Sequence, residues 1–216
     1  MKKINLKIIS IINYSVLFVT LLSLVSCKGK QNQIAQVLEA KQARPNIIYI
    51  MADDLTTQAI SSYEGIYKTI APTPNIDKLA NQGMLFQNTL CTNAICGPSR
   101  ASILTGNYSN INGYYKNESG GKFNDSLLTI PQEFQKNGYK TSLFGKWHLG
   151  SEPKGFDVFK YHNSANQQGM YWNPLYNING KDKKIKGYAT NITTNFALDW
   201  LKSNRQKDQP FLMVLQ

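Results

Sequence analysis

The sequence predicts an α/β fold with a mostly parallel sheet flanked by helices. Short apolar runs of strand length alternate with segments whose apolar residues recur at helical spacing, which is typical of parallel sheets. The predicted strands are 46–51, 84–90, 139–144 and 211–215. The predicted helices are 73–83, 98–104, 130–136 and 188–202. With 216 residues, 42% of them hydrophobic, the chain is long enough for one domain or for a piece of a larger one.

The first predicted strand, 46–51, is a near-continuous apolar run with β-branched and aromatic members. This pattern is typical of a strand buried on both faces. Thr73 can cap the next helix, Pro74 fits its first position, and Gly83 is its predicted end. The predicted buried stripe of this helix consists of Ile76, Leu79 and Ala80.

The later elements follow from similar signals. Pro98 and Gly106 fit the two ends of the helix at 98–104. The helix at 188–202 is predicted from apolar residues at helical spacing, namely Ile192, Phe196, Ala197, Trp200 and Leu201. The stretch 151–187 reads as a loop-rich insertion over one end of the sheet.

The N-terminus has the pattern of an export signal: a basic start, an apolar run over 8–25 and a small residue. Leu-Val-Ser-Cys27 resembles a bacterial lipobox, which implies acylation of Cys27 and a chain that is exported and lipid-anchored to a bacterial membrane, periplasmic or at the cell surface. The alternative is an ordinary secretory signal with an incidental cysteine. Residues 1–26 are the predicted lipoprotein signal peptide, 27–44 a polar tether, and 45–216 the folded part.

The charge balance is basic, with a formal net charge of +11. Such a balance suits a polyanionic partner, either nucleic acid, an anionic membrane or a sulfated or phosphorylated substrate. The lysines are dispersed and only three arginines occur, whereas nucleic-acid readers usually cluster both on one element. We therefore expect no nucleic-acid partner.

Cys96 and Arg100 form the first candidate site. Cys96 lies at the predicted start of the helix at 98–104, where free N–H groups favour negative charge, and Arg100 follows one turn later. The residues alone indicate an anion site beside a reactive sulfur. A buried cysteine with a surface arginine, or a Cys91–Cys96 disulfide in an exported protein, are the alternatives.

Two further groups follow predicted strands. Asp53 and Asp54 come directly after the first strand, where adjacent carboxylates repel unless a cation compensates, and oxygen ligands suit Ca²⁺ or Mg²⁺. The alternative is a solvated loop. Lys146 and His148 lie beyond the strand at 139–144, and in an extended chain both would project to one side.

The segment Cys96-Gly-Pro-Ser-Arg100 followed by Leu-Thr-Gly106 resembles the signature of the sulfatase family. The segment 138–150, with Gly-Tyr-Lys-Thr and Gly-Lys146-Trp-His148, resembles the second signature, and 44–54 resembles the opening strand. The resemblance implies that a maturation enzyme oxidises Cys96 to formylglycine, and that Asp53, Asp54 and residue 96 hold a divalent cation, calcium or alternatively magnesium. Cys91 would then be a lone thiol, buried beside the strand at 84–90.

The same resemblance implies roles for the remaining candidates. Arg100 and Lys146 would bind sulfate, and His148 would contact residue 96 or the sulfate. As a hypothesis, His148 helps to deprotonate the sulfated intermediate. Together these residues predict a sulfatase acting on sulfated glycans.

The resemblance covers 45–216, and sulfatases usually continue well beyond this length with further metal and sulfate ligands. We therefore expect a fragment that is incomplete alone. The alternatives are a phosphonate or phosphate-ester hydrolase of the same superfamily and a non-catalytic lipoprotein that binds sulfated glycans. Two features match no motif: His162, and the aromatic segment 171–174, which is either loop packing or a surface that stacks on sugar.

Overall fold

The computed structural model describes residues 44–117, 122–163, 168–205 and 208–216. The folded unit is Pro45–Gln216. The predicted signal peptide, nearly all of the predicted tether and Cys27, the predicted acylation site, lie outside the described residues. Within the described part of the chain, no helix combines the length and apolarity that a membrane crossing requires.

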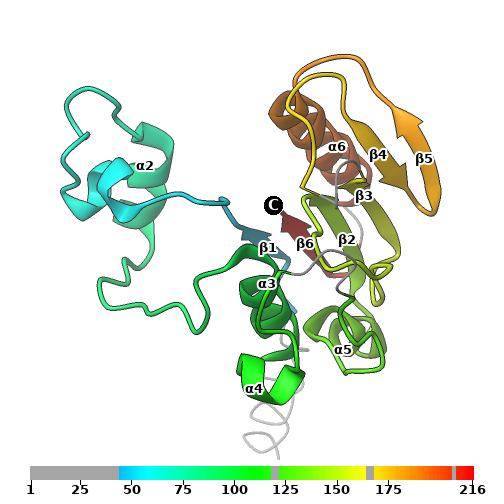
Figure 1. The fold of residues 1–216 in the computed structure, drawn as a ribbon. Coiled ribbons are helices and arrows are strands. Elements are labelled where there is room, and N and C mark those ends of the chain that lie inside the picture. The colour runs from blue at the N-terminus through cyan, green and yellow to red at the C-terminus, as the bar shows by residue number, and fades with distance from the viewer. Residues whose placement is uncertain (1–43, 118–121, 164–167, 206–207) are drawn as a thin grey trace, which may run out of the picture. The chain divides into compact units, whose positions relative to one another are not determined.

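A mostly parallel sheet flanked by helices forms the centre of the unit, and this confirms the predicted fold class (Figure 1). Its six described strands lie in the order β1 (Ile47–Ile50), β6 (Phe211–Leu215), β2 (Lys140–Gly145), β3 (Val158–His162), β4 (Leu175–Ile178) and β5 (Lys181–Lys184). The first four are mutually parallel, whereas β4 and β5 are antiparallel. The carboxyl ends of β1, β6 and β2 therefore meet at one edge, where ligand-binding groups of α/β folds gather.

The helices largely follow the predicted positions. They are α2 (Pro74–Gln82), α3 (Cys96–Thr105), α4 (Ser109–Asn112), α5 (Ile130–Lys136) and α6 (Ala189–Asn204), with short 3₁₀ turns η1 (Thr57–Ala59) and η2 (Ser61–Tyr63). The bounds of α5 match the prediction because Thr129 and Gln132 form a capping box at its start. The left-handed Gly106 ends α3 as predicted.

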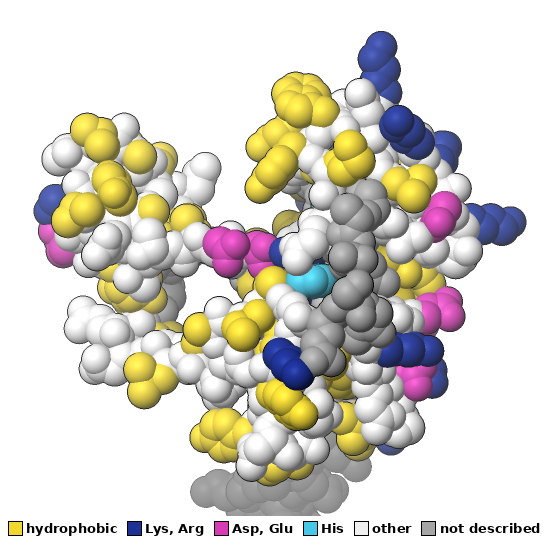
Figure 2. All heavy atoms as spheres, in the orientation of Figure 1, with side chains coloured by type: hydrophobic (Ala, Val, Ile, Leu, Met, Phe, Trp, Pro, Cys, Tyr) yellow, Lys and Arg dark blue, Asp and Glu magenta, His cyan; other side chains and the backbone are white. Residues whose placement is uncertain are grey.

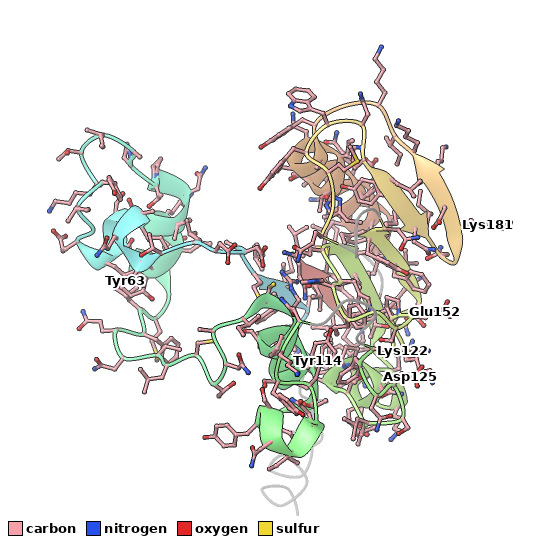
Figure 3. All side chains as sticks on the ribbon, in the orientation of Figure 1. Tyr63, Tyr114, Lys122, Asp125, Glu152 and Lys181 are labelled. Carbon is pink, nitrogen blue, oxygen red and sulfur yellow. The ribbon has the colours of Figure 1, made fainter. Side chains whose placement is uncertain are left out.

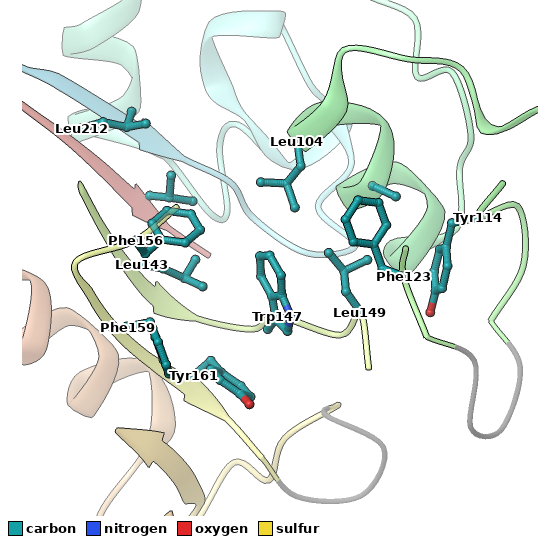
Figure 4. Close-up of a cluster of buried hydrophobic side chains, with 12 residues drawn as sticks. Leu104, Tyr114, Phe123, Leu143, Trp147, Leu149, Phe156, Phe159, Tyr161 and Leu212 are labelled. Carbon is teal, nitrogen blue, oxygen red and sulfur yellow. The ribbon is translucent and has the colours of Figure 1, made fainter. Parts of the chain in front are cut away.

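Each face of the central strands packs against its own helices. Alternate residues of β2 and β6, such as Leu143 and Leu212, join Leu104 of α3 in one buried cluster (Figure 4). The intervening residues, such as Phe144, join Trp200 of α6 in a second cluster. Since successive side chains of a strand point to opposite faces, this alternation places α3 and α6 on opposite sides of the sheet.

Strand β1 forms where predicted, but the expectation that both faces are buried is wrong. Ile47 and Tyr49 pack against the cluster that contains α3, whereas Ile48 and Ile50 are 47% and 65% exposed. The physical reason is that α6 contacts β2 and β6, and β1 lies beyond them at the edge of the described sheet.

Helix α2 begins at Pro74 and ends at Gly83 as predicted, but two details are wrong. The Thr73 hydroxyl does not cap the helix; it accepts a hydrogen bond from the Ser61 amide at 3.0 Å and donates one to Asp77 at 3.1 Å. The predicted stripe is not buried, and Leu79 is 66% exposed. The reason is that, within the described chain, α2 contacts mainly η2 and no sheet face.

The predicted strand at 84–90 is also wrong. This segment has no regular structure, and Met84, Phe86 and Leu90 are between 64% and 91% exposed. No neighbouring strand offers it a hydrogen-bonding partner among the described residues. Cys91, predicted to be buried beside that strand, is accordingly exposed, and both Cys91 and Cys96 are free thiols.

The stretch 151–187 is not a loop over the sheet. It contains β3, β4 and β5, which extend the sheet itself. The β4–β5 hairpin turns at Asn179 and Gly180, which both have positive φ, at 47° and 87°. An Asn-Gly turn of this kind matches the twist of paired strands, so it holds even a strongly charged strand such as β5 in the sheet.

Candidate active site

Cys96 is the first residue of α3, so the free N–H groups of the first helical turn lie around it. The Asn117 side-chain amide donates a hydrogen bond to Cys96 Sγ at 3.1 Å. The thiol is only partly buried. Position 96 is thus accessible from solvent while its surroundings favour negative charge.

One carboxylate joins two cations next to this helix. Arg100 is nearly fully buried, and its Nη2 lies 2.9 Å from Asp53 Oδ1. The Lys146 ammonium lies 2.6 Å from Asp53 Oδ2. Arg100 Nη1 also donates to the Lys146 backbone carbonyl at 2.8 Å and to the Gln216 side-chain carbonyl. The structure therefore brings Asp53, Arg100 and Lys146 together from three elements that are distant in sequence.

This arrangement perturbs the carboxylate. Burial raises the pKa of Asp53, but hydrogen bonds from Lys146 and Arg100 and the charges of both residues outweigh burial. The net result is a pKa below the ordinary value of 3.8. Asp53 is therefore ionised at neutral pH and compensates the buried guanidinium.

Gly97 sets how closely α3 approaches the segment after β2. A Cβ atom at this position would lie 2.5 Å from Asn117 Oδ1, 2.8 Å from the Tyr114 ring and 3.2 Å from the His148 carbonyl oxygen. Any larger residue would push these neighbours away. The glycine therefore allows residue 96 to lie next to the His148 backbone.

His148 is 93% buried, since only 7% of its surface is exposed. Its Nε2 lies 3.0 Å from the Gln168 side-chain amide, whereas its buried Nδ1 has no hydrogen-bond partner among the described residues. Burial, followed by the charges of Lys146 and Arg100, lowers the pKa of His148 below 6.5. The ring is therefore neutral at pH 7 and able to accept a proton.

The prediction that the chain around Lys146 and His148 is extended is wrong. His148 has a left-handed backbone with φ of 54°, and Gly145, at the end of β2, has φ of 112°. A Cβ at Gly145 would overlap the Gln216 carbonyl oxygen, so β6 and β2 approach too closely there for another residue. The chain turns at this point instead of continuing along the strand.

A cavity of about 260 Å³ lies between the segment that follows β1 and the first turn of α3. It is lined by residues of both segments and of the loop between them, including Asp53, Asp54, Cys91, Cys96, Ser99 and Arg100. Figure 2 shows acidic, basic and histidine side chains meeting on this face of the molecule. The predicted metal ligands and the predicted nucleophile thus share one cavity wall.

The donor atoms present suit a hard divalent cation. Asp53 and Asp54 supply carboxylate oxygens to the cavity, the ligand type that Ca²⁺ and Mg²⁺ prefer. Among the described residues, no three His, Cys, Asp or Glu side chains are grouped closely enough to hold a metal by themselves. The two carboxylates therefore fit as part of a coordination shell.

Two residues of the site were not predicted from the sequence. Gln168 contacts His148, and Asn117 contacts Cys96, yet each comes from a polar loop without a motif. Only the fold reveals them, because 20 or more residues separate each pair in sequence. The two signatures identified Arg100 as a candidate residue, but they predicted neither its burial nor the cavity that it lines.

The chain belongs to the sulfatase family, since the family model described as Sulfatase matches residues 45–216. It is 46% identical over 193 residues to an N-acetylglucosamine-6-O-sulfatase of Bacteroides thetaiotaomicron. This match covers 89% of this chain and 32% of that protein. It is 30% identical over 204 residues to an ulvan-active sulfatase of Formosa agariphila, covering 89% of this chain and 38% of that protein. The chain thus spans about a third of the length of the curated relatives it matches.

Solved structures give the same result. The chain matches a protein in complex with its substrate D-glucosamine-2-N,6-O-disulfate, with a TM-score of 0.74, 45% identity, and coverage of 80% of this chain and 34% of the other. It also matches Ps i-CgsB in complex with k-i-k-neocarrahexaose, with a TM-score of 0.71, 27% identity, and coverage of 80% and 44%. Both similarities extend over most of the folded unit.

Proposed function

We propose that the protein carrying this chain is a sulfatase that hydrolyses sulfate monoesters on sulfated glycans. The observation that carries the proposal is the cavity at the start of α3, where Cys96 and Arg100 lie beside Asp53 and Asp54. An anionic ester bound there would meet fixed cations and a helix N-terminus next to the reacting residue. Membership of the sulfatase family supports the same reaction class.

The proposed reacting group is a formylglycine produced from Cys96 by a maturation enzyme. In its hydrated form residue 96 bears two hydroxyl groups on one carbon. One hydroxyl would attack sulfur and lose its proton, and the bond between sulfur and the alcohol oxygen would break, with that oxygen taking up a proton so that it leaves as the alcohol. The second hydroxyl then loses its proton as the carbon–oxygen bond to sulfate breaks, which releases sulfate and restores the aldehyde, and water hydrates it again. A thiol has no second oxygen to drive this release.

The neighbouring side chains supply charge and proton transfer. Arg100 and Lys146 are proposed to bind the sulfate oxygens, because Arg100 lines the same cavity as Cys96 and both cations contact the carboxylate of Asp53. His148 is proposed to take the proton in the release step. Its neutral, buried ring, whose Nδ1 has no hydrogen-bond partner among the described residues, supports that role.

Asp53, Asp54 and residue 96 are proposed to hold a divalent cation, calcium or alternatively magnesium. When bound, such a cation polarises the sulfate oxygens and stabilises the charge that develops on them. The ion pairs of Asp53 leave its carboxylate with further lone pairs, so Arg100 and Lys146 do not exclude this use.

The first substrate to test is the 6-O-sulfate of N-acetylglucosamine. The relative named for this activity is 46% identical, and the solved structure with a glucosamine disulfate is 45% identical. Sulfated polysaccharides of other sugars are the comparison substrates.

We also propose export and anchoring through an acylated Cys27. The basic and apolar start of the chain and the Leu-Val-Ser-Cys27 segment support this location. Replacing Cys27 with serine should move the protein from the membrane fraction to the soluble fraction; an unchanged distribution would refute the anchor.

The central experiment uses the natural gene product that contains this chain, purified from its own host. Mass spectrometry of the peptide with residue 96 should show the mass of an aldehyde instead of a thiol, and the enzyme should release sulfate from N-acetylglucosamine 6-O-sulfate. Cys96→Ala should abolish release. An intact thiol at position 96 in fully active protein would refute the formylglycine chemistry.

A further inference from the structure

Three aromatic rings from the two segments that flank the β4–β5 hairpin in the chain form an exposed cluster. Tyr171 is 74% exposed, Trp172 66% and Tyr188 36%. The Tyr171 and Tyr188 rings are stacked at an interplanar angle of 16°, and the Trp172 ring centroid lies 5.2 Å from that of Tyr188. We call these three residues the aromatic platform. Pro174, just beyond it, is fully buried and fixes the C-terminal end of this exposed segment.

Backbone hydrogen bonds hold the platform in place. Trp172 and Tyr188 form an antiparallel bridge. The Ala189 amide donates to the Tyr171 carbonyl at 2.8 Å, and the Asn173 amide donates to the Gly187 carbonyl at 2.8 Å. Rings presented by a fixed backbone lose little conformational freedom on binding, which favours affinity for a ligand that packs against them.

The platform lies close to the site in the chain and in space. Gln168, whose amide is 3.0 Å from His148 Nε2, precedes Tyr171 by three residues. Three residues of fully extended chain span at most about 11 Å, so the Cα atoms of Gln168 and Tyr171 are no farther apart than that. The first residue of the platform is therefore tied closely to the loop residue that contacts His148.

The neighbouring hairpin is strongly basic. The exposed lysines of this region are Lys181, Lys183, Lys184 and Lys186, and none of them forms an ion pair within the described residues. The single acid, Asp182, is occupied by the side chains of Asn163 and Asn177. Figure 2 shows hydrophobic side chains beside basic ones in this part of the molecule, and Figure 3 shows Lys181 at the outer edge of β5. The partner that fits is an anion with an apolar face.

We propose that Tyr171, Trp172 and Tyr188 bind a sugar ring of a sulfated glycan, adjacent to the sugar whose ester is cleaved. This inference rests on the proposed function and assigns a second glycan subsite to it. The C–H face of a sugar ring packs against aromatic faces, while its sulfate groups are attracted by the lysines of the hairpin. The other possible occupant is a further part of the same protein.

The test measures binding separately from catalysis. In the natural gene product that contains this chain, with Cys96→Ala to prevent turnover, calorimetry would compare a sulfated glucosamine-containing tetrasaccharide with N-acetylglucosamine 6-O-sulfate. We expect Trp172→Ala to raise the Kd of the tetrasaccharide about tenfold, the loss of one good aromatic contact, and to leave the Kd of the monosaccharide unchanged. Trp172→Phe should restore most of the affinity. Tyr108→Ala, which removes another exposed ring at 63% exposure, is the matched control and should change neither value.

Three results would overturn the proposal. The first is a tetrasaccharide that binds no more tightly than the monosaccharide. The second is an equal effect of Trp172→Ala on both ligands. The third is a loss of stability in Trp172→Ala as large as that of a core aromatic, which would mean that the protein itself covers the ring. Tight binding of the tetrasaccharide without sulfate release by the protein with its native residue 96 would instead refute the proposed function and leave the platform intact.

Discussion

Replacing Asp53 with asparagine tests the charge arrangement of the site most directly. In the structure its carboxylate contacts both the Arg100 guanidinium and the Lys146 ammonium, at 2.9 and 2.6 Å. The substitution keeps the shape of the side chain and removes its charge. Two neighbouring cations would then remain without compensation in a largely buried place. We expect a substantial loss of stability, measured in the presence of a chelator so that no bound cation contributes.

The magnitude follows from the burial of the three groups. The Arg100 side chain is 1% exposed, that of Lys146 12%, and that of Asp53 32%. Removing one partner of a fully buried ion pair costs about 3 to 5 kcal/mol. Because Asp53 is one third exposed, solvent screens part of the interaction, and we expect about 2 to 3 kcal/mol. In a folding unit of about 150 to 250 residues this corresponds to a fall in Tm of about 4 to 12 °C, and the fall is smaller in a larger protein.

Urea denaturation of the wild-type protein and the variant measures the effect, with Asp54→Asn as the matched control. Asp54 lines the same cavity but forms no ion pair within the described residues, so its neutral variant should lose less than about 1 kcal/mol. Adding Lys146→Met to Asp53→Asn should recover part of the loss, because it removes one of the uncompensated cations. If Asp53→Asn were as stable as wild type, or no less stable than Asp54→Asn, the reasoning about the buried charges would be refuted.

Three further predictions concern the surroundings of the site. Burial and, to a smaller extent, the charge of Lys146 lower the pKa of His162 to about 4. As the pH drops, the unfolded chain binds a proton at this residue before the folded protein does, so the free energy of unfolding falls between about pH 6.5 and pH 4. In urea denaturation, His162→Phe should remove on the order of 2 to 3 kcal/mol of that pH-dependent loss. Gln168→Leu removes the partner of His148 Nε2, so kcat should fall about tenfold while KM stays unchanged. A change in KM as large as the change in kcat would contradict this prediction. Gly97→Ala should lower stability by about 1 to 3 kcal/mol and also lower kcat, because the new Cβ would crowd the His148 carbonyl; a fully active variant would show that α3 tolerates the shift.

The sequence predicted best those elements whose ends carry chemical signals. The bounds of α5 and β6 agree with the prediction, since Thr129 and Pro131 mark the start of α5, and β6 is a short apolar run that is buried in the centre of the sheet. The start of α3 at Cys96 follows from Pro98 within its first turn. Such signals act within one helical turn and can be read from the chain alone, unless a tertiary contact takes the capping side chain, as Ser61 takes that of Thr73.

The elements that were missed depend on tertiary partners. β5 is a strand of Lys and Asp residues, which no hydrophobic pattern indicates, although the Asn179-Gly180 turn was an available hairpin signal. Conversely, the apolar run at 84–90 has strand-like composition but no described strand beside it. The candidate site behaved in the same way. Asp53, Arg100 and Lys146 were candidates from the sequence and lie in contact, whereas the contact between Gln168 and His148 requires a fold that brings a distant loop to the end of β2.

The position of Asp53 also explains how two cations can be kept ready for an anionic ester. Arg100 and Lys146 would repel each other without a carboxylate between them. A single carboxylate holds both, and the Arg100 guanidinium is fixed further by the Lys146 carbonyl at 2.8 Å. Their side-chain freedom is therefore lost on folding and not on substrate binding, which lowers the entropic cost of recognising sulfate. On this view Asp53 contributes to the reaction twice, as a proposed ligand of the cation and as the residue that orders the anion-binding pair, and its neutral variant should bind sulfate esters weakly even where it remains folded.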